Sequence, residues 1–322
     1  MEFGFAPVQS RNDFKVMQAQ ATLAESLGFR TIWAHEHHSG RMMYPDPLFT
    51  LAALAPVTRE IGLGTNMLLL PIHHPLRVAQ EAAMLDVLSE GRLRLGVANG
   101  YSEQDLRAFG MTGAHRGQRL EEGLALIRSL WQGESVTLRG EGFDLVDFEL
   151  FPLPEQQPHP PIYVGGHAAI AIDRAARLGD EYLISTTQKM GEIQHLVKTY
   201  QDALATHGKP LRKPTLNRIV CVVDSAGARR EAEAFFSRAL LGLYDAWGHE
   251  SVTGLGDSER ALRVLCDDHF IIGEPEECVE HLGRYQALGI GHIACLMNFG
   301  GPPLELVERS MRLFGERVMP TL

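Results

Sequence analysis

The chain has 322 residues, of which 45% are hydrophobic and 22% are charged, a balance typical of a globular protein with a sizeable core. The 40 acidic residues outnumber the 30 basic ones, and the formal net charge of -10 disfavours partners such as nucleic acid or anionic membranes. The segment MEFGFAPVQS does not resemble a secretion signal, and no apolar run is long enough to cross a bilayer. We therefore expect a cytoplasmic protein.

Short apolar runs alternate with amphipathic stretches along the first half of the chain. The runs MEFGFAP, RTIWAH, IGLGTNMLLLP and RLRLGVAN have the length of buried strands. Helical spacing of apolar residues predicts helices over 13–27, 49–57, 75–88 and 116–131. This half therefore contains four β/α units.

The segment 134–160 alternates apolar and polar residues around Gly140 and Gly142, which predicts a hairpin inserted between units. The β/α alternation then resumes. Strands are predicted at PIYVGG, EYLIST, LNRIVCVVD, FIIG and GHIACLMNF, and helices over 169–178, 191–206, 228–247, 276–288 and 304–318. This β/α alternation along the whole chain predicts an α/β fold, a single (β/α)8 TIM barrel over residues 1–322. Residues 248–268 fit no period and are a candidate mobile loop.

The four cysteines, Cys221, Cys266, Cys278 and Cys295, are far apart and form no C-x-x-C pair, so we expect reduced thiols. We interpret the indoles of Trp33, Trp131 and Trp247 as packing groups.

Four segments in colinear order resemble one family. They are TIWAHEHH at 31–38, GTNMLLLPIHHPLRVAQEAAMLDVLSEGRLRLGVANGY at 64–101, PPIYVGG at 160–166 and GEPEECVEHL at 273–282. They resemble the bacterial luciferase-like flavin-dependent monooxygenases, and most of all the alpha chain of luciferase, alkanal monooxygenase. The resemblance implies a barrel whose active site lies at the carboxyl ends of the strands, as is general for this fold.

The resemblance also implies a set of catalytic residues. The first histidine of the EHH motif is His37, which would move protons between a flavin C4a-hydroperoxide and the substrate, with Glu36 or His38 as its orienting partner. The alternative is that these are ordinary polar residues at a strand end. A metal site made from residues 35–38 has no recognised spacing, so we expect no metal.

Two histidines, His73 and His74, precede Pro75 and are expected to shape the loop before the following helix.

The flavin ring is implied to lie against Asn66 and Met67 in the third strand, where the family frequently has a non-proline cis peptide; ordinary trans residues that fill the barrel are the alternative. Asn99, Gly100 and Tyr101 follow the fourth strand and are expected to line the same pocket.

The flavin phosphate is expected where a helix begins after the fifth strand, at Gly165, Gly166, His167 and Ala168, because helix N-termini bind anions. The sequence departs from the family here. The usual hydroxyl residue after this turn is absent, and Asn99 stands where luciferase has an arginine. Two phosphate anchors are therefore missing.

The sequence predicts a monooxygenase that uses reduced FMN, supplied by a separate flavin reductase, and O2 to oxygenate a small organic substrate, with a carbonyl compound as one candidate. The missing anchors leave two alternatives open, an F420-dependent oxidoreductase and a non-catalytic partner subunit of a heterodimeric monooxygenase. Because helices of the first units form dimer interfaces in the family, including the helix over 75–88, we expect a homodimer or heterodimer.

Overall fold

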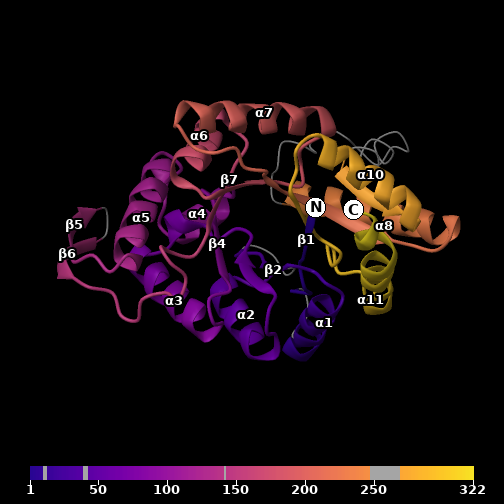
Figure 1. Cartoon of the computed structure of the whole chain (residues 1–322), viewed down its shortest axis with the longest axis horizontal. Helices are drawn as coiled ribbons and strands as arrows, with labels where there is room; N and C mark the ends of the chain where they lie inside the picture. The colour runs from indigo at the N-terminus through magenta and orange to yellow at the C-terminus, as the bar shows by residue number, and fades with distance from the viewer. Residues whose placement is uncertain (10–12, 39–42, 141–142, 247–268) are drawn as a thin grey trace.

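The computed structural model describes residues 1–9, 13–38, 43–140, 143–246 and 269–322. Eight parallel strands close into a barrel, each hydrogen-bonded to the next, and the last pairs with the first. Helices surround the strands as an outer ring (Figure 1). The strands in order around the barrel are β1 (Glu2–Phe5), β2 (Thr31–Ala34), β3 (Gly62–Thr65), β4 (Leu93–Val97), β7 (Ile162–Gly165), β8 (Glu181–Ile184), β9 (Thr215–Val222) and β11 (His292–Cys295). The predicted (β/α)8 barrel is confirmed.

A ninth parallel strand, β10 (Phe270–Gly273), pairs among the described strands with β9 alone, along its far half from Ile219 to Val222. The near half of β9 pairs with β8 and β11 and so belongs to the closed barrel. The predicted strand FIIG therefore exists, but it extends the sheet beyond the closed ring.

Most helices coincide with the amphipathic stretches of the sequence, and three of them begin and end at the predicted residues, namely α3 (Pro75–Leu88), α5 (Arg116–Trp131) and α6 (Ala169–Leu178). The others are α1 (Phe14–Ser26), α2 (Pro47–Leu54), α4 (Glu103–Ala108), α7 (Met190–Thr206), α8 (Ala226–Ala246), α10 (Pro275–Ala287) and α11 (Leu304–Leu313). Short 3-10 or π turns complete the set: Ala55–Val57, Leu70–Ile72, Phe314–Val318 and Met319–Thr321. Among the described residues, no helix has both the length and the hydropathy needed to span a membrane.

Helix α4 is absent from the sequence prediction. It has only 6 residues, too few to show a helical period, and its start depends on Ser102, whose hydroxyl accepts a hydrogen bond from the Asp105 backbone N–H at 3.2 Å.

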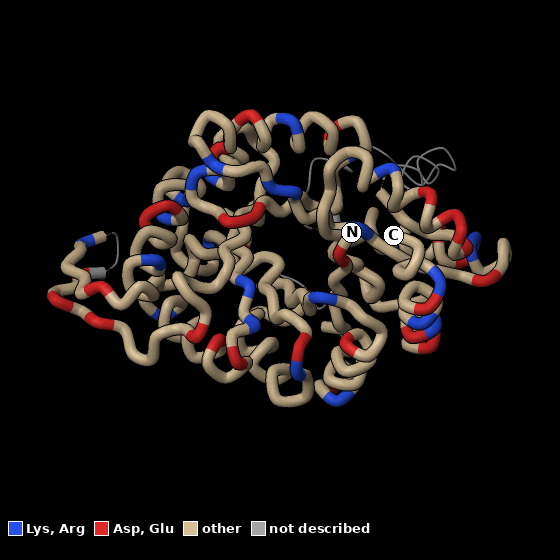
Figure 2. Tube along the Cα trace, viewed as in Figure 1, with Lys and Arg blue, Asp and Glu red and all other residues tan. Residues whose placement is uncertain are grey.

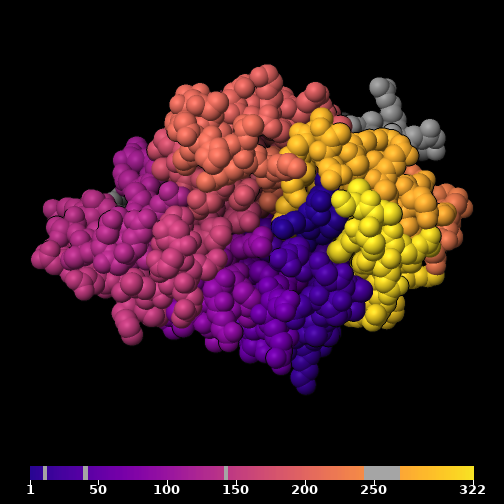
Figure 3. Space-filling view, in the orientation of Figure 1, coloured from indigo at the N-terminus to yellow at the C-terminus, as the bar shows by residue number. Residues whose placement is uncertain are grey.

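The inserted hairpin is formed by the antiparallel strands β5 (Val136–Gly140) and β6 (Phe143–Phe148). It lies outside the ring of helices (Figure 1), and its atoms form the left edge of the molecule in the space-filling view (Figure 3). The predicted loop 248–268, with Trp247 and Cys266, lies outside the described residues. The three other cysteines are buried free thiols, and burial raises the pKa of Cys221 and of Cys278 to about 12.

The barrel interior is filled by Trp33, whose side chain projects inward from β2 and is 0% exposed. Two glycines make room for it: a Cβ atom at Gly4 would lie 2.3 Å from the indole Nε1, and one at Gly64 would lie 2.3 Å from the ring. The Tyr163 ring meets the indole edge-on with centroids 5.3 Å apart, and His292 lies 5.7 Å away on another side. Trp33 therefore separates the two open ends of the barrel from each other.

Candidate active site

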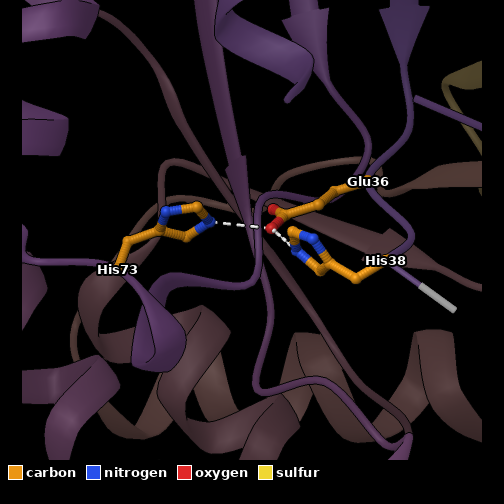
Figure 4. Close-up of side chains that lie close together, drawn as sticks. All are labelled: Glu36, His38 and His73. Atoms are coloured by element: carbon orange, nitrogen blue, oxygen red, sulfur yellow. Dashed lines mark hydrogen bonds and ion pairs between the residues drawn. The ribbon is translucent and has the colours of Figure 1, made fainter. Parts of the chain in front are cut away.

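Glu36 is the centre of a hydrogen-bond network just beyond the carboxyl end of β2 (Figure 4). Its side chain is fully buried, and one carboxylate oxygen, Oε1, is 2.6 Å from His38 Nε2 and 2.7 Å from His73 Nε2. The other oxygen, Oε2, accepts the Leu69 backbone N–H at 2.7 Å. A buried carboxylate thus holds two imidazole rings that come from different strand-to-helix connections.

The charges in this network stabilise one another. Burial alone would raise the pKa of Glu36, but the hydrogen bonds from His38 and His73 lower it below its usual value. Burial would likewise lower the pKa of His73, and here the hydrogen bond and negative charge of Glu36 raise it instead. Near neutral pH the carboxylate is therefore ionised, and His73 binds its proton more tightly than a histidine in water does.

His37 lies between these residues in sequence but has a different environment. Its ring faces Tyr101, with centroids 6.2 Å apart and the planes at 71°. Burial lowers the pKa of His37, and the nearby carboxylates of Asp105 and Glu36 only partly offset this. His37 is therefore a neutral imidazole at neutral pH, able to accept a proton.

Asn66 and Met67 directly follow β3, and the peptide bond between them is cis, as expected from the family resemblance. The amides of Asn66 and Asn217 exchange two hydrogen bonds of 2.7 and 3.1 Å across the barrel. The Met67 side chain lies against Gly165, where a Cβ atom would be 2.8 Å from Met67 Cε. These residues form the floor of the site, on the carboxyl side of Trp33.

The loop after β4 brings Asn99, Gly100 and Tyr101 to the same end of the barrel. Gly100 has φ 71°, a conformation that glycine adopts readily, and its carbonyl accepts a hydrogen bond from Arg116 Nη1 at 3.0 Å. The Asn99 side-chain oxygen is buried and has no hydrogen-bond partner among the described residues. Such an atom lacks a donor that a bound ligand could supply.

The turn after β7 carries the predicted phosphate residues. Gly166 has φ 146°, and a Cβ atom there would lie 2.5 Å from Ala171, so the turn requires glycine. His167 and Ala168 are exposed, and α6 begins at Ala169 without a side-chain cap. The uncapped N–H groups of this helix could receive an anion, which fits the expected phosphate position.

Three possible metal ligands also meet in this site, because Glu36 Oε1, His38 Nε2 and His73 Nε2 lie within 4.8 Å of one another. The set that we considered from the sequence, residues 35–38, is not brought together. Burial of its ring, together with nearby His37, lowers the pKa of His35 to about 3. The two nitrogen-to-oxygen distances of 2.6 and 2.7 Å are those of hydrogen bonds.

Sequence reasoning missed three residues of this site, His73, Arg116 and Asn217. The pattern HHP places His73 near a helix start but gives no sign of its distant partner. Arg116 and Asn217 could not be recognised because their contacts depend on how separate β/α units meet around the barrel.

A family model described as luciferase-like monooxygenase matches residues 1–292. The oxygenase component of a flavin-dependent trigonelline monooxygenase from Acinetobacter baylyi is 28% identical over 92% of this chain and 87% of its own length. An F420-dependent glucose-6-phosphate dehydrogenase from Microbacterium testaceum is 30% identical over 93% of this chain and 91% of its own length. The crystal structure of monooxygenase RslO1 from Streptomyces bottropensis superposes with a TM-score of 0.87 at 26% identity, covering 100% of this chain and 99% of that one.

The barrel, the buried polar cluster at the carboxyl ends of its strands and the relatives together define an oxidoreductase of the TIM-barrel class. The chain belongs to the luciferase-like monooxygenase family.

Proposed function

We propose that this protein is a flavin-dependent monooxygenase that uses reduced FMN and O2 to oxygenate a small organic substrate. The observation that carries the proposal is the buried Glu36 carboxylate, which holds His38 and His73 at 2.6 and 2.7 Å beside a neutral His37. This arrangement supplies a proton carrier and the groups that orient it, at the end of the barrel where this fold places its chemistry.

The bound reduced flavin would supply the electrons that activate O2. His37 would then accept or return a proton at its imidazole ring, because its lowered pKa keeps it neutral and ready to react near neutral pH. Glu36 would act as a positioning residue: it keeps negative charge close to His37 and fixes the rings of His38 and His73.

The flavin ring would lie over Asn66 and Met67, with Asn99, Gly100 and Tyr101 along its side. The buried, unpartnered oxygen of Asn99 supports this position, because a ring N–H could fill the missing hydrogen bond. The phosphate would be bound by the uncapped start of α6 after Gly165 and Gly166, beside His167 and Ala168.

Arg116 would supply part of the positive charge of the arginine that luciferase has after the fourth strand and that this chain lacks. It starts α5 and donates a hydrogen bond to the carbonyl of Gly100, so its guanidinium lies beside the loop after β4, where Asn99 replaces that arginine. We therefore count Arg116 among the candidate cofactor-binding residues, together with those expected from the sequence.

The related trigonelline enzyme is named an oxygenase component, which supports a separate flavin reductase as the source of reduced FMN here. Dimer formation is proposed through α2 and α3, where Phe49, Met84 and Leu88 are 67%, 59% and 54% exposed. Large apolar side chains that cluster at a surface are typical of an interface.

The second candidate is an F420-dependent oxidoreductase that transfers hydride and needs no O2. It is favoured by the relative that is 30% identical and named an F420-dependent dehydrogenase. A non-catalytic partner subunit is disfavoured because the chain retains Glu36, His37 and His38, with the Glu36 carboxylate buried and bonded to His38.

The deciding experiment is anaerobic titration of the protein with photoreduced FMN and, separately, with reduced F420, followed by mixing with O2. Tight binding of reduced FMN and oxygen uptake coupled to product from a panel of small carbonyl compounds would support the monooxygenase. Preferential binding of F420 with O2-independent turnover would overturn it in favour of the second candidate. If neither cofactor binds, a partner-subunit role replaces both.

A further inference from the structure

A cavity of about 460 Å³ opens at the amino ends of the strands, at the opposite end of the barrel from Glu36. Its wall includes residues near the starts of four consecutive strands, among them Gly62 of β3, Arg94 of β4, Tyr163 of β7 and Glu181 of β8. The volume is in the range of small-molecule sites. Figure 2 shows both basic and acidic positions around the centre of the ring on this face.

Arg94 projects into this cavity from β4. Gly62 on the neighbouring strand makes room for it, because a Cβ atom there would lie 2.7 Å from Arg94 Nε. The guanidinium is half-buried, and one of its nitrogens, Nη1, donates to the Tyr163 hydroxyl at 3.3 Å. The tyrosine hydroxyl keeps its own proton, which it can donate to a ligand.

Arg94 differs from two other arginines of the wall in what it binds. Arg92 donates to the backbone carbonyls of Ala55, Ile61 and Ser89 and to a threonine hydroxyl, at 2.6 to 3.2 Å. Arg212 donates to the carbonyls of Gly179 and Asp180. Among the residues that the structure describes, no carboxylate lies within 4.0 Å of the Arg94 guanidinium. Most of its donors are therefore available to a ligand.

Glu181 faces the same space from the start of β8 and makes no side-chain hydrogen bond or ion pair within the described part of the chain. Burial raises the pKa of Glu181 to about 7; Arg212 and Arg94 lower it, and Asp180 and Glu2 raise it. A carboxyl group with this pKa is partly protonated near neutral pH. In that form it adds no negative charge and donates one hydrogen bond.

We infer that this cavity is a second binding site, for a small tetrahedral oxyanion of the phosphate class, either free phosphate or a phosphate monoester. The planar guanidinium of Arg94 would donate two parallel hydrogen bonds to two oxygens of the anion. The O–H groups of Tyr163 and of protonated Glu181 would donate hydrogen bonds to the other oxygens. Arg30 at the rim adds a further positive charge. The four arginines of the wall outnumber its three carboxylates, Glu60, Asp180 and Glu181, so the cavity favours an anion over a metal cation.

Binding should depend on pH through Glu181. The charged and titratable groups that face it are Glu2 from β1, Arg94 from β4, Tyr163 from β7, Tyr200 from α7, Asp180 beside it and Arg212 before β9. Of these, Glu181 has a pKa near 7. As pH rises through about 7, its carboxyl group loses its proton and repels the anion, so affinity should fall.

The test is isothermal titration of the full chain with inorganic phosphate, and with glycerol phosphate as the monoester, in chloride buffers of constant ionic strength. Wild type should bind an anion, and Arg94→Gln should bind that anion at least roughly tenfold more weakly. Arg94→Lys retains the charge but not the planar guanidinium, and should bind phosphate several-fold more weakly than wild type. It keeps the test decisive if the glutamine variant folds poorly. Whichever of the two ligands binds more tightly, the monoester or free phosphate, is the class of ligand that we assign to the cavity. No binding above the chloride background would overturn the inference.

Three further variants locate the bound anion and isolate the contribution of Glu181. Arg284→Gln removes an exposed arginine on α10 that pairs with Glu280 at 2.6 Å, and should bind phosphate like wild type. Arg116→Ala tests the opposite end of the barrel: if it removes phosphate binding while Arg94→Gln does not, the anion binds at the flavin site and the inference is wrong. Sulfate, which does not titrate near pH 7, should bind wild type more weakly at pH 8 than at pH 6. Glu181→Gln should remove that difference, and a retained difference would contradict the role of Glu181.

Discussion

His73 Nε2 lies 2.7 Å from Glu36 Oε1, although 37 positions separate the two residues and they belong to different β/α units. The contact joins the loop after β2 to the loop after η2 (Leu70–Ile72), and the Leu69 backbone N–H binds the second oxygen of the same carboxylate. One buried side chain therefore fixes two connections that would carry both catalytic and cofactor-binding residues.

Glu36→Gln should destabilise the protein by about 3 kcal/mol near pH 6, because a buried charge network loses its central partner. The lowered pKa of Glu36 gives stability that is present above the ordinary value of 4.5 and lost as pH falls through the folded value. The raised pKa of His73 gives stability that is complete below 6.5 and lost as pH rises through the folded value. Urea unfolding from pH 4 to 9 should show that the free energies of unfolding of wild type and variant differ most from about pH 5 to 6.5.

The matched control for this experiment is Asp202→Asn, which removes an exposed partner of Lys198 at 2.8 Å and should change stability little at any of these pH values. If the free energies of unfolding of wild type and Glu36→Gln differ by the same amount at every pH, the hydrogen bonds of Glu36 are not coupled to ionisation.

His37→Ala should lower kcat by roughly 10²- to 10⁴-fold while the affinity for reduced FMN stays within about twofold of wild type, because the imidazole moves protons and does not hold the cofactor. The acid limb of the kcat profile should lie below pH 6.5, since burial lowers the pKa of His37, and this limb should disappear in the variant. Steady-state rates from pH 5 to 8 measure both effects. His195→Ala on the exposed side of α7 is the control, and equal rates for wild type and His37→Ala would exclude the assigned role.

Arg116→Ala should weaken FMN binding by roughly tenfold and leave riboflavin binding almost unchanged, because a guanidinium contributes mainly to binding of the phosphate. Fluorescence quenching of each flavin provides the two affinities. Arg107→Ala removes an exposed arginine of α4 that pairs with Glu103, and should affect neither. An equal loss of affinity for FMN and for riboflavin would mean that Arg116 only stabilises the loop at Gly100.

Gly64→Ala should destabilise the barrel by about 2 kcal/mol, since the added methyl group would overlap the Trp33 ring at 2.3 Å and the surrounding strands leave the ring no room to move. Urea unfolding measures the loss, and tryptophan emission reports a displaced indole. Gly283→Ala, where nothing lies within 4 Å of the new Cβ atom on α10, should instead be neutral or stabilising. A Gly64→Ala variant as stable as wild type would show that the interior can adjust.

Met84→Glu should convert a dimer into a monomer by placing a charge on the exposed apolar face of α3. Light scattering after size-exclusion chromatography gives the mass of each species. The control Leu211→Glu changes a side chain that is 74% exposed before β9, and should leave the mass unchanged. If wild type itself elutes as a monomer of 35.7 kDa, the proposed interface is wrong.

The fold could be predicted because its signals are local. Pro75 and Arg116 begin helices whose apolar spacing is visible along the sequence, and α3 and α5 end where that spacing ends. Strand β10 could not be distinguished from a barrel strand, because FIIG is as apolar as its neighbours and only its register with β9 places it outside the ring.

The candidate site, like the fold, could be predicted from the sequence only in part. Glu36, His37 and His38 form a continuous motif that the sequence makes recognisable, whereas His73 is expected from the sequence only to shape its loop. Its role in binding Glu36 depends on the closed barrel, which brings the third connection beside the second. The cavity around Arg94 has no sequence signal, because it is assembled from single residues at the starts of several strands.

The Trp33 indole, packed against Gly4, Gly64 and Tyr163, has a thermodynamic consequence for the whole barrel. Because the indole lies between the two mouths, the free-energy effects of changes at His37 and at Arg94 should be additive to within about 0.5 kcal/mol in a double-mutant cycle. Each mouth could then acquire new substitutions during evolution, or be redesigned, without altering the energetics of the other.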